Sequence, residues 1–415
     1  MLSLALAAAA AFTGLVSAGS GFTGKPVVSG YWPAYARNLL KPDDIPYNIY
    51  THIDWFVAGT KDSYELDLYG TASDLNTLVS KAHDAGVTVS MSIGGWTGSI
   101  WFSDLVSNST GREEFAKSIK HYIDLYDLDG VGFPSVQGMG CNKIRPEDSD
   151  NFLEFLDVLR HTVGPDVRLT SAVSVWGIMG ADGKIYNRTS EFANYLDYVT
   201  IMAYDIYNVF ATTTGPLGAL YDTCATQYGH GASGASAAKI WTDAGELSVQ
   251  TVGNSSSLIY QEKTGEIPKG GVTSGAAGKD VCGTQWNATA SWLFRELIST
   301  GKLDANGTSA AGAWTRYWDD CSQTPFLFNN ATRELIAYDD AQSYAAKAEY
   351  VRQHGMAGIN MFDLTGDSSD SKLISAARSQ LIGSFSDVGT SSTFASPAAQ
   401  TSAPKSETPS SAHCK

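Results

Sequence analysis

Residues 72–96 read ASDLNTLVSKAHDAGVTVSMSIGGW, and this stretch combines the two patterns that decide the fold. Over Ala72–Ala85 the apolar residues recur at intervals of three and four, which predicts an amphipathic helix. Over Val87–Ile93 the chain is rich in β-branched residues and predicts a buried strand, which Gly94 and Gly95 end. A helix followed directly by a buried strand is typical of a parallel α/β protein.

The same alternation continues along the chain. Further strands are predicted at Val27–Tyr31, Thr51–Ala58, Leu128–Phe133, Arg168–Val175, Tyr198–Ala203, Leu247–Val252 and Gly358–Phe362. Further helices are predicted at Arg112–Tyr126, Ser149–His161, Ala235–Ala244 and Ala341–His354. Eight strands favour an α/β protein of the closed (β/α)8 form, a TIM barrel. The wide spacing between the last two strands predicts a small α+β insertion after the seventh strand, at residues 256–338.

Composition and charge argue against several classes of partner. The chain has 415 residues, a net charge of −15 and a pI of 4.8, so we expect no binding to nucleic acid or to an anionic membrane. It contains no Cys-x-x-Cys pair, so neither a metal site nor another cofactor is predicted. Its 10 Trp and 20 Tyr side chains can fill a core or stack on sugar rings.

The two ends of the chain differ from its body. Residues 1–18 combine an apolar run with Val16-Ser17-Ala18, which predicts a signal peptide and secretion. Residues 384–415 are rich in Ser, Thr and Pro and predict a disordered tail, which leaves 19–383 for the barrel. Sequons for N-glycosylation begin at Asn108, Asn187, Asn254, Asn287, Asn306 and Asn330, and in an exported chain they predict a glycoprotein.

Cysteine usage agrees with an oxidising compartment. Cys141, Cys224, Cys282 and Cys321 predict two disulfides, and three pairings of these four residues are possible. Cys414 is left over beside the C-terminus.

The carboxyl ends of the predicted strands carry the most informative motifs, because the functional side chains of a TIM barrel lie there. These ends read Tyr31-Trp32, Ser92-Ile93-Gly94-Gly95-Trp96, Asp129-Gly130-Val131-Gly132-Phe133, Met202-Ala203-Tyr204-Asp205 and Met361-Phe362-Asp363. In this order, and with Tyr317-Trp318-Asp319 and Ala337-Tyr338-Asp339-Asp340 further on, they resemble glycoside hydrolase family 18, the chitinase family, and particularly its secreted fungal members. The resemblance covers nearly all of 26–383 and implies chitin or its N-acetylglucosamine oligosaccharides as the partner.

The resemblance also implies a catalytic motif on the fourth strand, Asp-Gly-x-Asp-x-Asp-x-Glu. In the family, the Glu protonates the leaving glycosidic oxygen while the N-acetyl carbonyl of the substrate attacks the anomeric carbon. Because strand side chains alternate between faces, the last two Asp and the Glu all point into the barrel.

This chain departs from that motif. Aligning Asp129 with the first acid places Gly132 and Pro134 at the two inner Asp positions and Val136 at the Glu. No proton donor remains there, and Pro134 also removes a backbone N–H from a central strand. The seventh strand departs as well, since Gly253-Asn254 stand where the family usually carries Tyr-Gly. No catalytic residue is therefore intact, and the sequence as it stands favours binding over hydrolysis.

Two hypotheses account for the missing acid. In the first, the loss is genuine and the protein is a chitin-binding descendant with impaired hydrolysis. In the second, a gene-model error removed the motif from an active chitinase, which would hydrolyse β-1,4 N-acetylglucosaminyl links by substrate-assisted catalysis. A purely structural secreted or cell-wall role would need neither the acid nor the sugar site.

Several sugar-binding positions remain in the sequence. By resemblance, Met202, Tyr204 and Asp205 lie beneath the sugar nearest the cleavage point, where Tyr204 and Asp205 hydrogen-bond the acetamido group. Tyr31 and Trp96 line the same mouth, and Phe362 stands where the family usually places a larger, stacking Trp. The insertion is expected to deepen one wall of the cleft.

Overall fold

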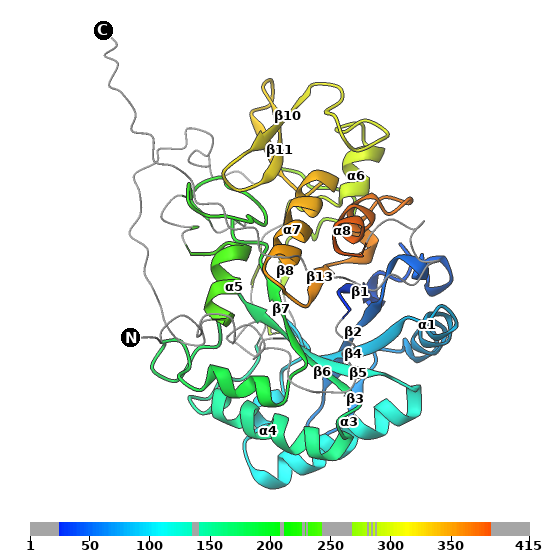
Figure 1. Ribbon diagram of the computed structural model, residues 1–415, viewed down its shortest axis with the longest axis vertical. Helices are drawn as coiled ribbons and strands as arrows, with labels where there is room; N and C mark the ends of the chain where they lie inside the picture. Colours follow the sequence, from blue (N-terminus) through cyan, green and yellow to red (C-terminus); the bar gives the residue numbers. More distant parts are fainter. Residues whose placement is uncertain are drawn as a thin grey trace, which may run out of the picture.

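A parallel sheet curled into a nearly closed barrel forms the centre of the molecule (Figure 1). The computed structural model describes residues 25–134, 141–207, 211–225, 229, 231–242, 268–279, 282–283, 285–286 and 289–382. The sheet order is β13-β1-β2-β4-β5-β6-β7, and every neighbouring pair in it is parallel. The strands are β1 Val27–Pro33, β2 His52–Thr60, β4 Thr88–Ile93, β5 Gly130–Pro134, β6 Arg168–Ser174, β7 Tyr198–Met202 and β13 Gly358–Met361, with β3 Leu66–Asp67 antiparallel to β2.

This order confirms the predicted TIM barrel. The seven strands match seven of the eight predicted ones, each within a few residues at either end. The remaining prediction, Leu247–Val252, lies outside the described residues and falls in the sequence between β7 and β13.

Amphipathic helices pack around the barrel because each buries one apolar stripe. Helix α1 (Ala72–Asp84), for example, buries Leu75, Leu78, Val79 and Ala82. Helix α3 begins three residues before its predicted start because Asn108 caps it, accepting a hydrogen bond from the Gly111 backbone N–H at 3.0 Å. The other helices are α2 Phe102–Val106, α3 Ser109–Tyr126, α4 Asp148–Val163, α5 Gly234–Thr242, α7 Ala341–Gln353 and α8 Lys372–Ile382, with short 3-10 helices at Ala34–Ala36, Pro42–Asp44, Tyr47–Ile49, Thr189–Asn194 and Leu364–Gly366.

The packing around β5 fixes which of its residues face the barrel interior. Phe133 points outward, where its ring centroid lies 6.0 Å from that of Phe102 and 5.7 Å from that of Phe155. Because side chains alternate along a strand, Gly132 faces inward. A Cβ added at Gly132 would lie 4.0 Å from Asp54 Oδ1 and only 2.7 Å from Thr170 Oγ1, so this position faces the same interior as these two side chains, and Thr170 would have to shift to admit a larger residue.

Residues of the predicted insertion form small elements of both types. They comprise β8 Gly278–Lys279, β9 Gln285–Trp286, α6 Phe294–Ser299, β10 Trp314–Asp319, β11 Thr324–Asn329 and β12 Glu334–Ala337. Strands β10, β11 and β12 make an antiparallel sheet, and β8 pairs with β9. In Figure 1, α6, β10 and β11 lie at one end of the molecule, opposite α3 and α4.

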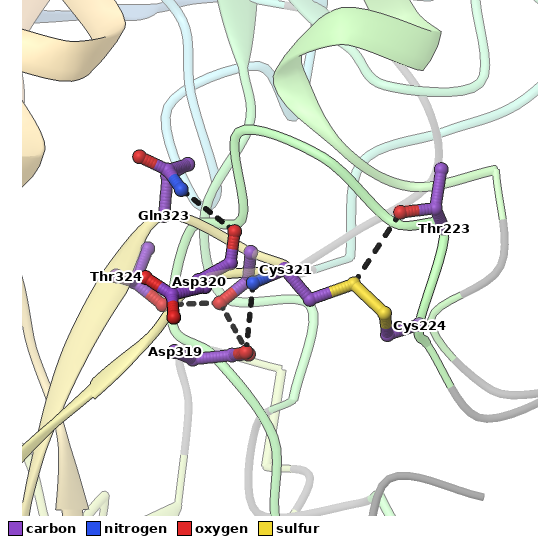
Figure 2. Close-up of a disulfide and its surroundings, with 8 residues drawn as sticks. Thr223, Cys224, Asp319, Asp320, Cys321, Gln323 and Thr324 are labelled. Atoms are coloured by element: carbon purple, nitrogen blue, oxygen red, sulfur yellow. Dashed lines mark hydrogen bonds between the residues drawn. A yellow bond between two sulfur atoms is a disulfide. The ribbon is translucent and has the colours of Figure 1, made fainter. Parts of the chain in front are cut away.

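Two disulfides connect the insertion to loops of the barrel. Cys141, beyond β5, is bonded to Cys282, and Cys224, beyond β7, is bonded to Cys321 at the turn between β10 and β11 (Figure 2). Of the three pairings that the sequence left open, the structure therefore has this one. The Cys321 turn is further ordered by Asp319, whose carboxylate accepts hydrogen bonds from Cys321 N and Ser322 Oγ.

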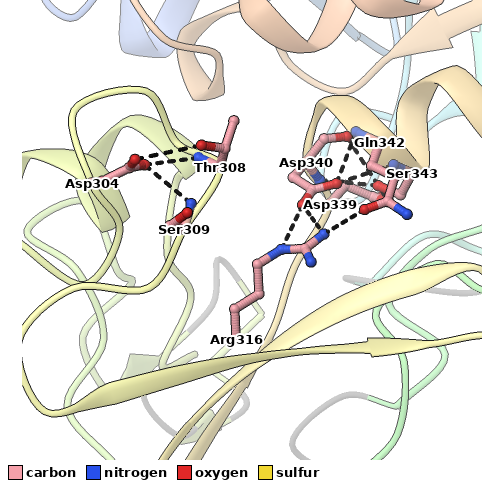
Figure 3. Close-up of polar contacts among 8 residues, drawn as sticks. All are labelled: Asp304, Thr308, Ser309, Arg316, Asp339, Asp340, Gln342 and Ser343. Carbon is pink, nitrogen blue, oxygen red and sulfur yellow. Dashed lines mark hydrogen bonds and ion pairs between the residues drawn. The ribbon is translucent and has the colours of Figure 1, made fainter.

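An ion pair also joins the insertion to helix α7. The Arg316 guanidinium on β10 donates to the Asp340 carboxylate at 2.6 Å and to Gln342 Oε1 at 2.9 Å (Figure 3). Asp340 is buried and caps α7 by accepting from the N–H groups of Gln342 and Ser343. The insertion sheet is therefore fixed to the start of the helix that packs against β13.

Other predicted segments lie outside the described residues. These are the signal peptide at 1–18, the tail at 384–415, and the sequons at Asn254 and Asn287. The described sequon residues Asn108, Asn187, Asn306 and Asn330 are all exposed. No helix among the described segments is long and apolar enough to span a membrane.

Candidate functional site

A cluster of aromatic rings lies at the carboxyl ends of β1, β2, β7 and β13. We call Tyr31, Tyr35, Phe56, Tyr204 and Phe362 the aromatic platform. The Phe362 ring centroid lies 5.4 Å from Tyr31, 5.5 Å from Phe56 and 6.0 Å from Tyr204. The rings of Tyr204 and Phe362 are nearly parallel, at 18°. With 43% of Phe362 exposed, the platform presents an open apolar face of the kind that stacks on a sugar ring.

Two members of this platform, Phe56 and Tyr35, were not among the predicted site residues. Phe56 lies in β2, which is apolar along most of its length. Such a strand shows no alternation from which a residue of the barrel mouth could be told apart from a core residue. Tyr35 lies in a 3-10 helix just after β1 and is 67% exposed, with its ring 6.3 Å from that of Phe56. A single exposed Tyr in such a short helical turn gives no sequence signal that it belongs to a site.

Polar groups surround the platform beside β7 and β13. Tyr204 and Asp205 directly follow β7, and burial raises the pKa of both side chains. Asp205 remains accessible to solvent although protein surrounds it, and its φ of 57° places its backbone in the left-handed region. Burial also raises the pKa of Asp363, whose carboxylate accepts from Thr365 N at 2.8 Å. The structure thus brings the rings of Tyr31, Tyr204 and Phe362 together, with Asp205 adjacent to Tyr204 in sequence.

Trp96 and Met202 occupy different parts of the mouth. Trp96 is 55% exposed beyond β4, and the backbone there is fixed by Asn142, whose Nδ2 donates to Gly95 O and Trp96 O at 3.2 Å each. Met202 is the last residue of β7, half-buried and paired in register with Ser174. Met202 therefore lies at the end of its strand, and Trp96 lies three residues beyond the end of β4.

The interior next to β5 contains polar groups but lacks the family's inner acid. Beside Gly132 lie Thr170 and Asp54, and Asp54 Oδ2 accepts from Asn360 Nδ2 at 3.4 Å. Two buried hydroxyls of the described interior, Ser90 Oγ and Tyr198 OH, have no hydrogen-bond partner. Ser90 lies opposite Gly130 in the register of β4 and β5, and Tyr198 lies opposite Thr170. These two buried hydroxyls are therefore left unsatisfied in an interior where buried polar groups usually have partners.

Asp129, the first acid of the motif, is not at the mouth. It precedes β5 and lies at the amino end of that strand, where its Oδ2 accepts from Val89 N at 2.7 Å and lies 2.9 Å from His83 Nε2. Asp197 does the same at the amino end of β7, accepting from Leu169 N at 2.8 Å. Asp129 thus ties neighbouring strands together and does not touch the candidate site. Val136 lies outside the described residues, as does the side chain of Pro134.

A second polar group fills the barrel near the amino ends of the strands. Arg168 on β6 donates to Thr88 Oγ1 at 2.8 Å and contacts His52 Nδ1. Burial and the neighbouring Arg168 charge lower the pKa of His52, so the imidazole is neutral in the folded protein at pH 7. In the described part of the chain, no group of three or more His, Cys, Asp or Glu side chains is arranged to hold a metal ion.

Comparison with known proteins decides the family. A family model described as glycosyl hydrolases family 18 matches residues 27–367. The chain belongs to glycosyl hydrolase family 18. A chitinase-like effector from Moniliophthora roreri is 30% identical to it over 84% of this chain and 91% of the relative. A chitinase-like effector from Moniliophthora perniciosa is 29% identical over 86% and 87%.

Solved structures support the family 18 fold. The crystal structure of a chitinase from Rhizomucor miehei superposes with a TM-score of 0.74 at 26% identity, covering 85% of this chain and 99% of that one. The protein is therefore a chitinase-family protein whose barrel keeps the platform on one side and lacks the inner motif acid at Gly132 on the other.

Proposed function

We propose that this protein is a secreted, chitin-oligosaccharide-binding member of family 18 with little or no hydrolytic activity. The proposal rests mainly on Gly132, which occupies the inner position of β5 facing Thr170 and Asp54. Because glycine has no side chain, the strand offers no carboxylate there to orient an acetamido group. The aligned Glu position, Val136, offers no proton to a leaving oxygen. Loss of a general acid commonly costs about 10²–10⁴ in rate.

The platform supports the binding half of the proposal. A sugar ring can stack on the exposed Phe362, and Tyr204, stacked beside it, is followed by Asp205, so a hydroxyl and a carboxylate that can donate and accept hydrogen bonds lie next to the platform. The two Moniliophthora relatives are chitinase-like effectors, which supports a chitinase-like role for this chain as well. The two disulfides support an extracellular location.

A specific observation favours a second candidate, an active chitinase whose recorded sequence lacks the motif. The buried hydroxyls of Ser90, opposite Gly130 on the strand beside β5, and of Tyr198, opposite Thr170, have no hydrogen-bond partner. A barrel shaped around acids would keep such partners if a gene-model error alone had removed the acids.

Two measurements separate these candidates. The transcript is sequenced across Leu128–Asn142, and the encoded protein is then titrated calorimetrically with N-acetylglucosamine oligosaccharides and assayed for their cleavage. We expect the transcript to encode Gly132 and Val136, and the protein to bind oligosaccharides without cleaving them. A longer transcript with Asp-x-Asp-x-Glu would establish the second candidate. A matching transcript whose protein binds no oligosaccharide would contradict the proposed function.

A further inference from the structure

A groove lies on the outer surface of the barrel, between helices α3 and α4 and the 3-10 helix Thr189–Asn194. We call it the outer groove: α3 contributes lining residues within 109–113, α4 contributes lining residues within 153–158, and Arg188 and Tyr195 line it on either side of the 3-10 helix. In Figure 1, α3 and α4 lie at the end of the molecule opposite α6 and β10. The volume of the groove is about 240 Å³, somewhat below the ~300–1,000 Å³ of pockets that enclose drug-sized ligands, so it suits a small ligand.

The arginines of the outer groove already have partners of opposite charge. The Arg112 side chain is only 12% exposed and forms an ion pair with Glu154. Arg188 forms ion pairs with Asp150 at 2.9 Å and with Glu191 at 2.8 Å. A charged ligand would have to compete with these pairs, whereas a neutral hydroxyl can still bond to a lone pair of an exposed carboxylate such as Glu154. The outer groove therefore favours a neutral ligand rich in hydroxyl groups over an anion or a cation.

Apolar side chains complete the lining of the outer groove. Leu153 and Val158 come from α4, and the half-buried Tyr195 adds an aromatic ring. Burial and the neighbouring Asp157 carboxylate, to which the Tyr195 hydroxyl is hydrogen-bonded, raise the pKa of Tyr195. An aromatic ring can pack against the apolar face of a sugar while polar groups around it bond to the sugar hydroxyls. The outer groove thus offers both kinds of contact that hold a sugar residue.

Two of the glycosylation sequons adjoin the outer groove. Asn108 directly precedes Ser109 and Asn187 directly precedes Arg188, and both asparagines are exposed. The Asn108 side chain is held in one orientation, because its Oδ1 accepts from Gly111 N at 3.0 Å as the cap of α3. Its Nδ2 carries two protons, of which glycosylation replaces one. A glycan can therefore be attached to Asn108 without loss of the cap.

We infer that Asn108 carries an N-linked glycan whose first N-acetylglucosamine residues lie in the outer groove and cover the surface between α3 and α4. In the modification, Asn108 Nδ2 forms a bond to the anomeric carbon of a lipid diphosphate-linked oligosaccharide, the bond from that carbon to the diphosphate breaks, and Nδ2 loses one proton. Because the glycan is attached beside the groove, its effective concentration there is high, and weak contacts are sufficient to hold it.

The inference needs the secretion that belongs to the proposed function, but not the sugar site at the barrel mouth. Protein secreted from a eukaryotic host is digested, and a glycosidase removes the N-glycans from its peptides in heavy-oxygen water, which marks each occupied asparagine. We expect Asn108 to be marked. Marking of Asn306 or Asn330 without Asn108 would overturn the inference while leaving the proposed function intact.

Variants of Thr110 test whether this glycan covers the groove. Thr110→Ala removes the sequon but keeps the Asn108 cap, whereas Thr110→Ser keeps both, and Thr110 itself is exposed. Hydroxyl-radical footprinting reports the solvent exposure of Tyr195, and we expect its oxidation to rise several-fold in Thr110→Ala and to be unchanged in Thr110→Ser. Unchanged oxidation in both variants would overturn the inference. A rise produced instead by Asn187→Gln, which removes the other adjoining sequon, would overturn the assignment to Asn108.

A second pair of variants fills the groove and leaves the sequon intact. Glu113 lines the outer groove, whereas the next residue, Glu114, does not, and both are exposed. We expect Glu113→Trp to displace the glycan, so that the glycosidase removes it from the native protein several-fold faster, and Glu114→Trp to leave that rate unchanged. Release from Asn330, in the insertion, is the internal reference. Equal rates in the two variants would place the glycan outside the groove and overturn the inference.

Discussion

The two sides of the barrel mouth differ: the ends of β7 and β13 carry aromatic and acidic side chains, whereas the inward position of β5 carries none. At β7 and β13, Tyr204 and Phe362 stack, and Asp205 and Asp363 lie beside them. At β5, the inward position is Gly132. Yet β5 still pairs in register with both β4 and β6, and Phe133 still fills the outer aromatic core. The barrel is therefore held by its outward face and its ladders, while inward side chains at strand ends are free to change.

The largest effect is expected from restoring the missing acids on β5. The variant Gly132→Asp/Pro134→Asp/Val136→Glu returns the motif acids to an interior in which Ser90 and Tyr198 have unpartnered hydroxyls and in which Thr170 must shift to admit the new side chain at 132. We expect cleavage of N-acetylglucosamine oligosaccharides to rise at least about 10²-fold above the unmodified protein. Release of reducing ends over time measures it, with Gly132→Asp/Pro134→Asp/Val136→Gln as the control. Retained binding without a gain in turnover would mean that the β7 and β13 side no longer aligns with β5.

The next largest effect is expected at Asp129, whose replacement should change stability but not oligosaccharide binding. Replacing Asp129 by Ala leaves the buried Val89 N–H without its acceptor and should lower the free energy of unfolding by about 1–3 kcal/mol. Oligosaccharide affinity should not change, because this carboxylate lies at the amino end of the strand. Chemical denaturation and calorimetry measure the two quantities, and Asp129→Asn, which keeps an oxygen acceptor, is the control. A loss of affinity with unchanged stability would place Asp129 in the site after all.

A smaller effect is expected on the preserved side. Phe362→Ala removes the exposed ring of the platform and should weaken oligosaccharide binding by about 1 kcal/mol, roughly fivefold in Kd. Tyr221→Ala is a matched control, since Tyr221 is similarly exposed, at 38%, but its ring packs on Tyr350 of α7. Equal losses in both variants would contradict a stacking role for Phe362.

The sequence predicted the barrel well because its patterns are local. The amphipathic spacing of α1 and the β-branched run of β4 each depend on neighbours in the chain, and both appear within one or two residues of their expected bounds. The boundaries that differ, such as the start of α3 at Ser109, depend on a single capping side chain.

The site was predictable only in part, because it is assembled from distant strands. Motif order pointed to Tyr204, Asp205 and Phe362, but nothing in the chain links Phe56 to Phe362, which lie 306 positions apart in the sequence. The disulfide pairing was equally undecidable, since it depends on where the insertion folds back over the rim. The different role of Asp129 reflects the length of β5, which begins one residue after it.

The smallest expected effect concerns the charge of Asp205. Burial raises the pKa of this carboxyl, so the folded protein binds more protons than the unfolded chain between the ordinary Asp pKa and the raised value. The free energy of unfolding should therefore rise as the pH falls through that raised pKa, by up to about 1.4 kcal/mol per pH unit for one proton. Oligosaccharide binding should change in the opposite direction, because an acetamido N–H donates best to the ionised carboxylate. Affinity should thus fall several-fold over the same pH range in which the free protein becomes more stable.

Calorimetry and denaturation across that pH range measure the affinity and the stability. Asp205→Asn should flatten the dependence of affinity on pH. Asp363 and Asp367, which also have raised pKa values, should still contribute to the dependence of stability on pH. An affinity profile unchanged in Asp205→Asn would show that this side chain does not accept a hydrogen bond from the ligand.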